Sequence, residues 1–420
     1  MERLKGFRDF FPEPLPAGEP WSCDLRNHIF ARWRETARRY GFREYDGPPV
    51  EPLELYTNKS GPEIVAQLFN FVDKGDREVS LRPEMTPTVA RMVAATERAY
   101  RKPLKWFSLP QLFRYEKAQV EKGRLREHFQ LNCDIFGEAD PAADAEMVAL
   151  LVDVLRACGL TAEDFVVRLS SRQAWQRFFA ARGGDPARAY DFYQVVDKME
   201  RERPEVSEAR FAELGVRQAD VAAFIEASVP EPELQVVLDS LAARGLGGFV
   251  RIDYGVIRGL AYYTGIVFEA FDRKGEFRAI AGGGRYDQLI QQVSEGRLNL
   301  PALGFGMVDV VLANLLRSRG LAPAAVARVD AVVLIEDEAR RPASLGLVQR
   351  LREAGRAVDY SLTPAKGDRQ FKRALELGAA CTLRLESDPA GQPVVRLRDL
   401  RTRAEQVLSL DAAVATVSAG

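Results

Sequence analysis

The fold is decided by residues 105–138, KWFSLPQLFRYEKAQVEKGRLREHFQLNCDIFGE. Both ends of this stretch read as strands, and the long charged connection between them, residues 117–126, favours an antiparallel pair joined by a mobile loop. Each strand carries a charge within apolar sequence: Arg114 lies between two aromatic residues, and Asp134 precedes two apolar ones. Because a buried charge without a partner is costly, these side chains need counter-charges or a ligand.

The sequence on either side alternates between helical and strand-like patterns. Helices are expected over 18–41, over 90–98 and over most of 140–245. Strands are expected at 69–73 and 78–81 around a polar turn, and again at 249–254 and 262–271. From about residue 325 onward, strands and helices alternate regularly. This change predicts a separate C-terminal α/β domain, 326–420, with a mainly parallel sheet, after a larger domain, 1–325.

Composition excludes several classes of protein. The chain has 420 residues, with 59 Lys and Arg against 60 Asp and Glu, so it cannot hold nucleic acid by bulk charge. No apolar run is long enough to span a bilayer, and the N-terminus lacks the apolar stretch of a signal peptide. Four scattered cysteines and two histidines argue against a disulfide scaffold and a zinc site, so we predict no protein-bound metal. We expect a reduced, cytoplasmic, soluble protein with no membrane partner.

Three segments concentrate charge within apolar sequence: LRPEMT at 81–86, the strand pair, and RGLAYYTGIVFE at 258–269. The charged side chains in them that could act together are Glu84, Glu116, Asp134, Arg114 and Arg258. Structural ion pairs are one explanation. The other is a ligand that carries an ammonium and a phosphate or carboxylate, because a guanidinium about 4 Å from an anionic oxygen contributes about 4 kcal/mol at a protein-like dielectric. The cluster GGGR at 282–285, taken alone, favours close backbone packing over ligand contact.

Taken together and in order, these motifs resemble the histidyl-tRNA synthetase family of class II aminoacyl-tRNA synthetases. The resemblance also includes GFREYDGPPVEPLELY, GGGRYDQL, PALGFGM, the N-terminal LKGFRDFFP and the C-terminal RQFKRALELGA. It implies an α+β catalytic domain on an antiparallel sheet, a helical insertion at about 160–245, and a C-terminal anticodon-binding-type α/β domain. It also implies a homodimer that uses histidine, ATP with Mg²⁺ as a substrate complex, and tRNA(His).

The resemblance assigns roles to individual residues. Glu84 and Thr86, assisted by Gln130, would hold the α-ammonium of histidine, and Asp134, Tyr262 and Tyr263 would surround its imidazole. Arg114 and Arg258 would be the catalytic cations at the α-phosphate of ATP, and Glu116 would lie near the adenine. In the loop 117–126, Lys122, Arg124 and Arg126 would reach the ATP phosphates and the acceptor end of the tRNA.

The chain departs from the family pattern in three places. Ala261 stands where an acid is usual, Asp134 replaces a glutamate, and Val311 occupies the position of the arginine that ends the third class II motif and packs against ATP. Arg285 is a candidate for the missing phosphate contact. These departures keep two other functions open: a catalytically silent, histidine-sensing regulatory subunit of ATP phosphoribosyltransferase, and a tRNA-binding module without catalysis. The retained Glu84 and Arg258 favour the ligase.

Overall fold

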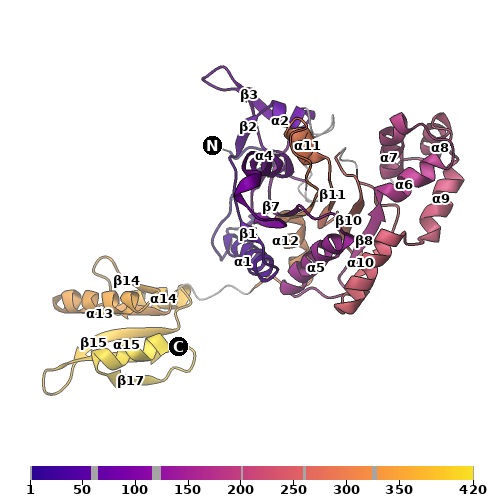
Figure 1. The fold of residues 1–420 in the computed structure, drawn as a ribbon. Coiled ribbons are helices and arrows are strands. Elements are labelled where there is room, and N and C mark those ends of the chain that lie inside the picture. The colour runs from indigo at the N-terminus through magenta and orange to yellow at the C-terminus, as the bar shows by residue number, and fades with distance from the viewer. Residues whose placement is uncertain are drawn as a thin grey trace. The chain divides into compact units, whose positions relative to one another are not determined.

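The structure of the chain is a computed structural model that describes residues 2–57, 65–115, 124–199, 202–258, 262–323 and 329–419. The chain forms two compact units, Met1–Ala322 and Pro323–Gly420 (Figure 1). The boundary predicted near residue 325 falls within 324–328, which lies outside the described residues. Within the described ranges, no helix has both the length and the apolar character needed to cross a membrane.

The first unit is built on a large, mainly antiparallel sheet. Its strands are β1 (Arg43–Glu44), β5 (Leu104–Ser108), β6 (Gln111–Phe113), β7 (Glu127–Phe136), β8 (Phe165–Ser171), β9 (Val250–Ile252), β10 (Ile266–Asp272), β11 (Ala281–Arg285) and β12 (Ala302–Val308). They follow the order β1, β5, β7, β12, β11, β10, β8, β9, and β6 pairs with β7 beside this path. Among the strand pairs of this sheet that the structure describes, only β1 with β5 and β8 with β9 are parallel. The predicted antiparallel sheet is therefore confirmed.

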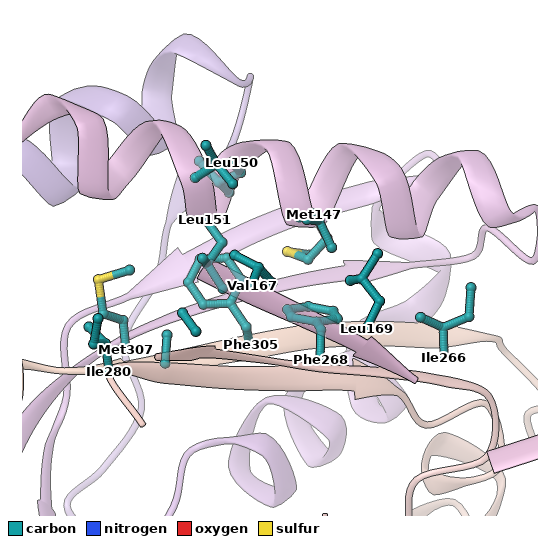
Figure 2. Close-up of a cluster of buried hydrophobic side chains, with 14 of the residues drawn as sticks. Met147, Leu150, Leu151, Val167, Leu169, Ile266, Phe268, Ile280, Phe305 and Met307 are labelled. Carbon is teal, nitrogen blue, oxygen red and sulfur yellow. The ribbon is translucent and has the colours of Figure 1, made fainter. Parts of the chain in front are cut away.

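Helix α5 (Pro141–Ala157) covers one face of this sheet (Figure 2). It begins at Asp140, whose side chain accepts a hydrogen bond from the backbone N–H of Ala142 at 2.8 Å. The buried side chains of this core include Met147, Leu150, Leu151, Val167, Leu169, Phe268, Phe305 and Met307. Burial of a side chain of this size contributes about 1.5–3 kcal/mol. Because side chains alternate along a strand, the residues between these strand positions face the opposite side of the sheet.

A second, smaller sheet and several further helices also belong to this unit. The sheet has the order β2 (Val50–Pro52), β4 (Glu78–Leu81), β3 (Phe69–Val72), so the predicted hairpin is confirmed. The helices are α1 (Cys23–Arg39), α2 (Glu54–Thr57), α4 (Thr86–Thr96), α11 (Leu289–Val293) and α12 (Asp309–Ser318). The helix expected at 90–98 therefore begins earlier, at Thr86, directly after the acidic motif.

The predicted helical segment at 160–245 contains a strand. Its helices are α6 (Arg172–Ala180), α7 (Ala189–Lys198), α8 (Pro204–Glu213), α9 (Gln218–Ala227) and α10 (Pro232–Ala243). Strand β8 precedes them and pairs with both β10 and β9 in the main sheet. The sequence FVVRLSS did not reveal this strand, because a short apolar run buried on both sides has no periodicity that separates it from a helix.

The second unit is an α/β domain with a mixed sheet. Its elements are β13 (Ala331–Leu334), α13 (Arg341–Glu353), β14 (Val358–Tyr360), α14 (Gly367–Glu376), β15 (Cys381–Ser387), β16 (Pro393–Asp399), β17 (Glu405–Leu408) and α15 (Leu410–Ala419). Strands β14, β13 and β15 are parallel, as predicted. Strands β15, β16 and β17 are antiparallel, so the expectation of a mainly parallel sheet is wrong for this half. Short hairpin turns, not helices, connect these last strands, and such turns join only antiparallel neighbours.

Candidate active site

A cavity of about 580 Å³ lies against the face of the large sheet that α5 leaves uncovered. Its floor comes from β7, β11 and β12, and its walls come from the start of α4, the residues before β7, and residues 255–258 and 262–263. Predicted site residues that line it are Glu84, Thr86, Arg114, Arg124, Gln130, Arg258, Tyr262 and Tyr263. Folding therefore brings three segments that are far apart in the sequence to one place.

Glycines keep this floor clear for long side chains. A Cβ atom at Gly282 would lie 1.6 Å from Nη1 of Arg258, and one at Gly306 would lie 2.2 Å from Nε2 of Gln130. Gly283 instead packs against backbone, because its Cβ would lie 2.2 Å from the carbonyl oxygen of Gly304. The GGGR cluster thus has the close backbone packing that its sequence favoured. It also leaves space in the cavity for the side chain of Arg258.

Glu84 is a buried acid whose two carboxylate oxygens have different surroundings. Its Oε2 accepts a hydrogen bond from the hydroxyl of Tyr262 at 3.0 Å. Its Oε1 has no hydrogen-bond partner among the described residues, although the side chain is buried. Burial and the neighbouring Glu84 carboxylate raise the pKa of Tyr262, so the hydroxyl remains a donor at neutral pH. An unpartnered, buried carboxylate oxygen in a cavity is suited to bind a cationic ligand group.

Arg258 is held in the cavity by several contacts. Its Nη1 donates to Oε1 of Glu269 at 2.6 Å, and its guanidinium lies 5.5 Å from the ring centroid of Tyr263. Burial disfavours the charged form of Arg258, but Tyr263, Glu269 and Tyr262 outweigh that effect and raise its pKa. Its φ of 57° is left-handed, a conformation that a residue with a side chain adopts at a cost of about 1–3 kcal/mol.

Arg172, the first residue of α6, holds the backbone that carries Arg258. Its Nε donates to the carbonyl oxygen of Ile257 at 3.0 Å, and its Nη2 donates to the carbonyl oxygen of Arg258. The guanidinium also lies over the ring of Tyr193 on α7, 4.4 Å from its centroid. Burial lowers the pKa of Arg172 to about 10, which leaves it charged at neutral pH. The helical insertion therefore helps to fix the strained backbone at Arg258.

Asp134 lies beneath the cavity and does not line it. Its Oδ1 accepts a hydrogen bond at 2.5 Å from the hydroxyl of Tyr286, which does line the cavity. Burial raises the pKa of Asp134 to about 7, and hydrogen bonds from Tyr286 and Asn132 only partly offset this effect. Asp134 can therefore act on a ligand through Tyr286.

Polar side chains continue along β7 from Asp134 toward the loop. Nε2 of Gln130 donates to Oδ1 of Asn132 at 2.5 Å, and Nε2 of His128 lies 3.4 Å from Oε1 of Gln130. Burial and the nearby Arg114 lower the pKa of His128 to about 3, so its ring is neutral at physiological pH. These three side chains line the cavity at every second position, as strand geometry requires.

The arginines of the strand pair point in different directions. Nε of Arg114 donates to the carbonyl oxygen of Pro83 at 3.1 Å, which positions its guanidinium at the cavity wall. Arg126 does not line the cavity; its guanidinium lies 4.4 Å from the ring centroid of Tyr115. Glu116 and Lys122, to which the resemblance gave roles, lie within 116–123, outside the described residues.

Arg285 does not supply the missing phosphate contact. Its guanidinium pairs with the buried Asp144 of α5 and donates to the carbonyl oxygen of Glu138 at 2.8 Å, and it does not line the cavity. Val311 does line the cavity. The earlier suggestion of Arg285 is thus wrong, because this guanidinium is used to join the sheet to the start of α5.

Comparison with known proteins identifies the family. The model of the histidyl-tRNA synthetase family matches residues 18–309, and that of the anticodon binding domain matches 330–419. The chain belongs to the histidyl-tRNA synthetase family. The resemblance found in the motifs is therefore confirmed, together with a class II fold followed by an anticodon-binding domain.

Relatives and solved structures agree with this assignment. The histidine–tRNA ligase of Opitutus terrae is 46% identical, over 96% of this chain and 95% of its own length. The histidine–tRNA ligase of Natronomonas pharaonis is 38% identical, over 94% of this chain and 93% of its own. The fold resembles that of histidyl-tRNA synthetase from Nostoc, with a TM-score of 0.76 at 20% identity over 97% and 99% of the two chains. It also resembles a Bacillus halodurans protein described as an ATP phosphoribosyltransferase regulatory subunit/histidyl-tRNA synthetase, with a TM-score of 0.71 at 21% identity over 89% and 96%.

Several residues of this synthetase-family cavity were not singled out from the sequence. They are His128, Asn132, Arg168, Asp197, Glu269, Arg278 and Tyr286. His128 and Asn132 could have been predicted from the sequence, because each lies two positions from Gln130 on the same strand and so faces the same side. Arg168 could not, since strand β8 itself was not predicted. Arg278 and Tyr286 flank the glycine cluster and enter the cavity only because β11 pairs with β12.

Proposed function

We propose that this protein is a histidine–tRNA ligase, which activates histidine with ATP and transfers it to tRNA(His). The observation that carries the proposal is that one cavity contains both Oε1 of Glu84, which has no hydrogen-bond partner among the described residues, and the guanidinium of Arg258. The substrate has a matching distribution of charge: histidine brings an ammonium, and ATP brings phosphates. Family membership and relatives named histidine–tRNA ligase support the same reading.

In the proposed first step, an oxygen of the histidine carboxylate attacks the α-phosphorus of ATP. A new C–O–P bond forms, the bond to the β-phosphate oxygen breaks, and pyrophosphate leaves with the electron pair. Magnesium enters with ATP as part of the substrate. Negative charge shifts along the phosphates during this step, and Arg114 and Arg258 stabilise it because they line the cavity as fixed cations.

Recognition of histidine follows from the opposite charges and from the tyrosines. Glu84 binds the ammonium, with Thr86 and Gln130 beside it. Tyr262, Tyr263 and Tyr286, the last backed by Asp134, surround the imidazole. A site built to hydrogen-bond a polar side chain rejects analogues that lack it by a factor of about 10⁴ or more. In the second step, a hydroxyl of the terminal adenosine of the tRNA attacks the activated carbonyl carbon, and AMP leaves.

The C-terminal unit is proposed to bind the anticodon, and the active species is proposed to be a homodimer. Two arginines of this unit are engaged in ion pairs: Arg373 pairs with Asp359 at 3.0 Å, and Arg396 pairs with Glu386 at 2.9 Å. Anticodon recognition therefore depends on local hydrogen bonding more than on surplus charge.

The alternative function is that of a regulatory subunit of ATP phosphoribosyltransferase, a name that appears in the description of the Bacillus halodurans protein. At 21% identity, that likeness concerns the fold alone. The relatives that match at 34–46% identity are named histidine–tRNA ligases, which favours the enzyme.

Two assays separate these functions. Histidine-dependent exchange of pyrophosphate into ATP reports adenylate formation, and charging of tRNA(His) reports transfer. We expect both activities, with other amino acids inactive. Folded protein that shows neither activity but stimulates a phosphoribosyltransferase would support the regulator instead.

A further inference from the structure

The cavity has two chemically different ends. The tyrosine end contains Tyr262, Tyr263 and Tyr286 over Asp134, which is opposite Gly304 on β12. The valine end contains Val308, which is opposite Gln130 on β7, and Val311 on α12. Gln130 and Asp134 are four positions apart on β7, so the two ends lie about 13 Å apart at about 3.3 Å per residue.

The valine end is where the family pattern places its third-motif arginine, and this chain has Val311 there. Val308 and Val311 lie three positions apart at the beginning of α12, on the cavity side. Leu125 also lines this end and packs in a cluster with Val310 and Val308. Apolar side chains cannot balance the charge of a triphosphate, so a cation must come from a neighbouring segment.

Arg278 comes from such a segment. It lies two residues before Ile280, whose carbonyl oxygen accepts a hydrogen bond from the backbone N–H of Val308 at 3.1 Å. Because β12 lies between β7 and β11, the residues that precede β7 and those that precede β11 flank the end of β12 on opposite sides. Arg124 therefore borders the valine end from one side and Arg278 from the other, and both line the cavity.

Three other arginines among the described residues line the cavity, and one of them, Arg258, lies over the middle of the floor, where a Cβ atom at Gly282, opposite Gly306, would meet its Nη1. Arg258 pairs with Glu269, and Arg114 donates to Pro83. Arg168 lies 3.4 Å from Asp253 and has its guanidinium 4.4 Å from the ring centroid of Phe271. Arg278 is exposed to solvent at the cavity wall, beside the valine end.

We propose that Arg278 takes the place of the missing third-motif arginine and binds the β- and γ-phosphates of ATP. A guanidinium suits this task because its parallel N–H groups can donate to two phosphate oxygens at once. The α-phosphate remains with Arg114 and Arg258, and Arg258 lies over Gly282, between the two ends. This inference rests on the proposed use of ATP and adds the residue that recognises its terminal phosphates.

The test compares ATP with AMP, which lacks the terminal phosphates. Dissociation constants are measured by calorimetry in the presence of Mg²⁺ for the full-length protein, for Arg278→Ala and for Arg278→Gln. We expect both variants to bind ATP about tenfold or more weakly, while AMP affinity changes less than about twofold. Lys274→Ala is the matched control, because Lys274 is an exposed cation of the same connection that does not line the cavity.

Two results would overturn the inference: unchanged ATP affinity in both variants, or equal weakening of ATP and AMP. Pyrophosphate exchange by the unsubstituted protein is measured separately. If exchange is absent while the ATP-specific loss occurs, the proposed ligase activity fails and the role of Arg278 stands. If exchange is normal and the variants bind ATP normally, the ligase stands and the role of Arg278 fails.

Discussion

The hydroxyl of Tyr262 donates a hydrogen bond to Oε2 of Glu84 at 3.0 Å, although the two residues are 178 positions apart. This bond satisfies one carboxylate oxygen and leaves Oε1 without a partner among the described residues. Glu84 is thereby oriented before any ligand arrives. A site prepared in this way binds an ammonium group without first rearranging its own side chains.

Glu84→Gln removes the charge and should raise the KM for histidine by about 10- to 100-fold, since a hydrogen bond to a charged group contributes about 1.5–3 kcal/mol. The measurement is pyrophosphate exchange at varied histidine. Inhibition by imidazolepropionate, which lacks the ammonium, should hardly change. Glu78→Gln is the control, because Glu78 is an exposed acid on β4. Equal losses for both compounds would show that Glu84 does not read the ammonium.

Arg258→Ala should slow adenylate formation by about 10²- to 10³-fold, as expected when a cation at the developing charge is removed. Histidine affinity, measured by calorimetry, should change only a few-fold. Arg251→Ala serves as a control because Arg251 is an exposed arginine on the nearby strand β9. A loss of histidine affinity as large as the loss of rate would contradict the assigned role.

Arg172→Met should slow exchange about tenfold by releasing the backbone carbonyls of Ile257 and Arg258. If Arg172 acts only by positioning Arg258, the double variant with Arg258→Ala should be no slower than Arg258→Ala alone. Arg177→Met, an exposed position on the same helix, is the control. Multiplicative losses in the double variant would assign Arg172 a separate, general structural role.

The raised pKa of Asp134 predicts a specific dependence of protein stability on pH. Burial raises its pKa from 3.8 to about 7, so between these values the folded protein binds a proton that the unfolded chain has lost. The contribution of Asp134 to the free energy of unfolding is therefore fully present below pH 4. It declines as pH rises toward 7, by up to about 1.4 kcal/mol per pH unit.

Asp134→Asn removes this titration. The Tm of the protein without substitution, measured by calorimetry from pH 4 to pH 8, should fall more with rising pH than the Tm of the variant. Parallel curves would refute the prediction. Histidine affinity of the same variant tests the imidazole role, since an unchanged dissociation constant would mean that neither Asp134 nor its bond to Tyr286 contributes to recognition.

Much of the site could be predicted because several of its residues stand out from the sequence immediately around them. Glu84, Arg114 and Arg258 are charges within apolar sequence, and burial of such charges is costly without a partner or ligand. The predicted pair of strands also follows from local pattern. In contrast, β8 was missed because the environment that makes its apolar run a strand is supplied by β10 and β9, which are distant in sequence.

The sequence by itself determined which charged and polar residues the motifs contain and the order of these motifs along the chain, and this order indicated the family. Only the tertiary structure decided which cations reach the cavity. Arg285 immediately follows the glycine cluster yet pairs with Asp144, whereas Arg278, from the less conspicuous residues before the cluster, lines the wall. The physical reason is strand registry: alternation along a strand sets which side a residue faces, but the pairing of β11 with β12 and the packing of α5 set what it meets there.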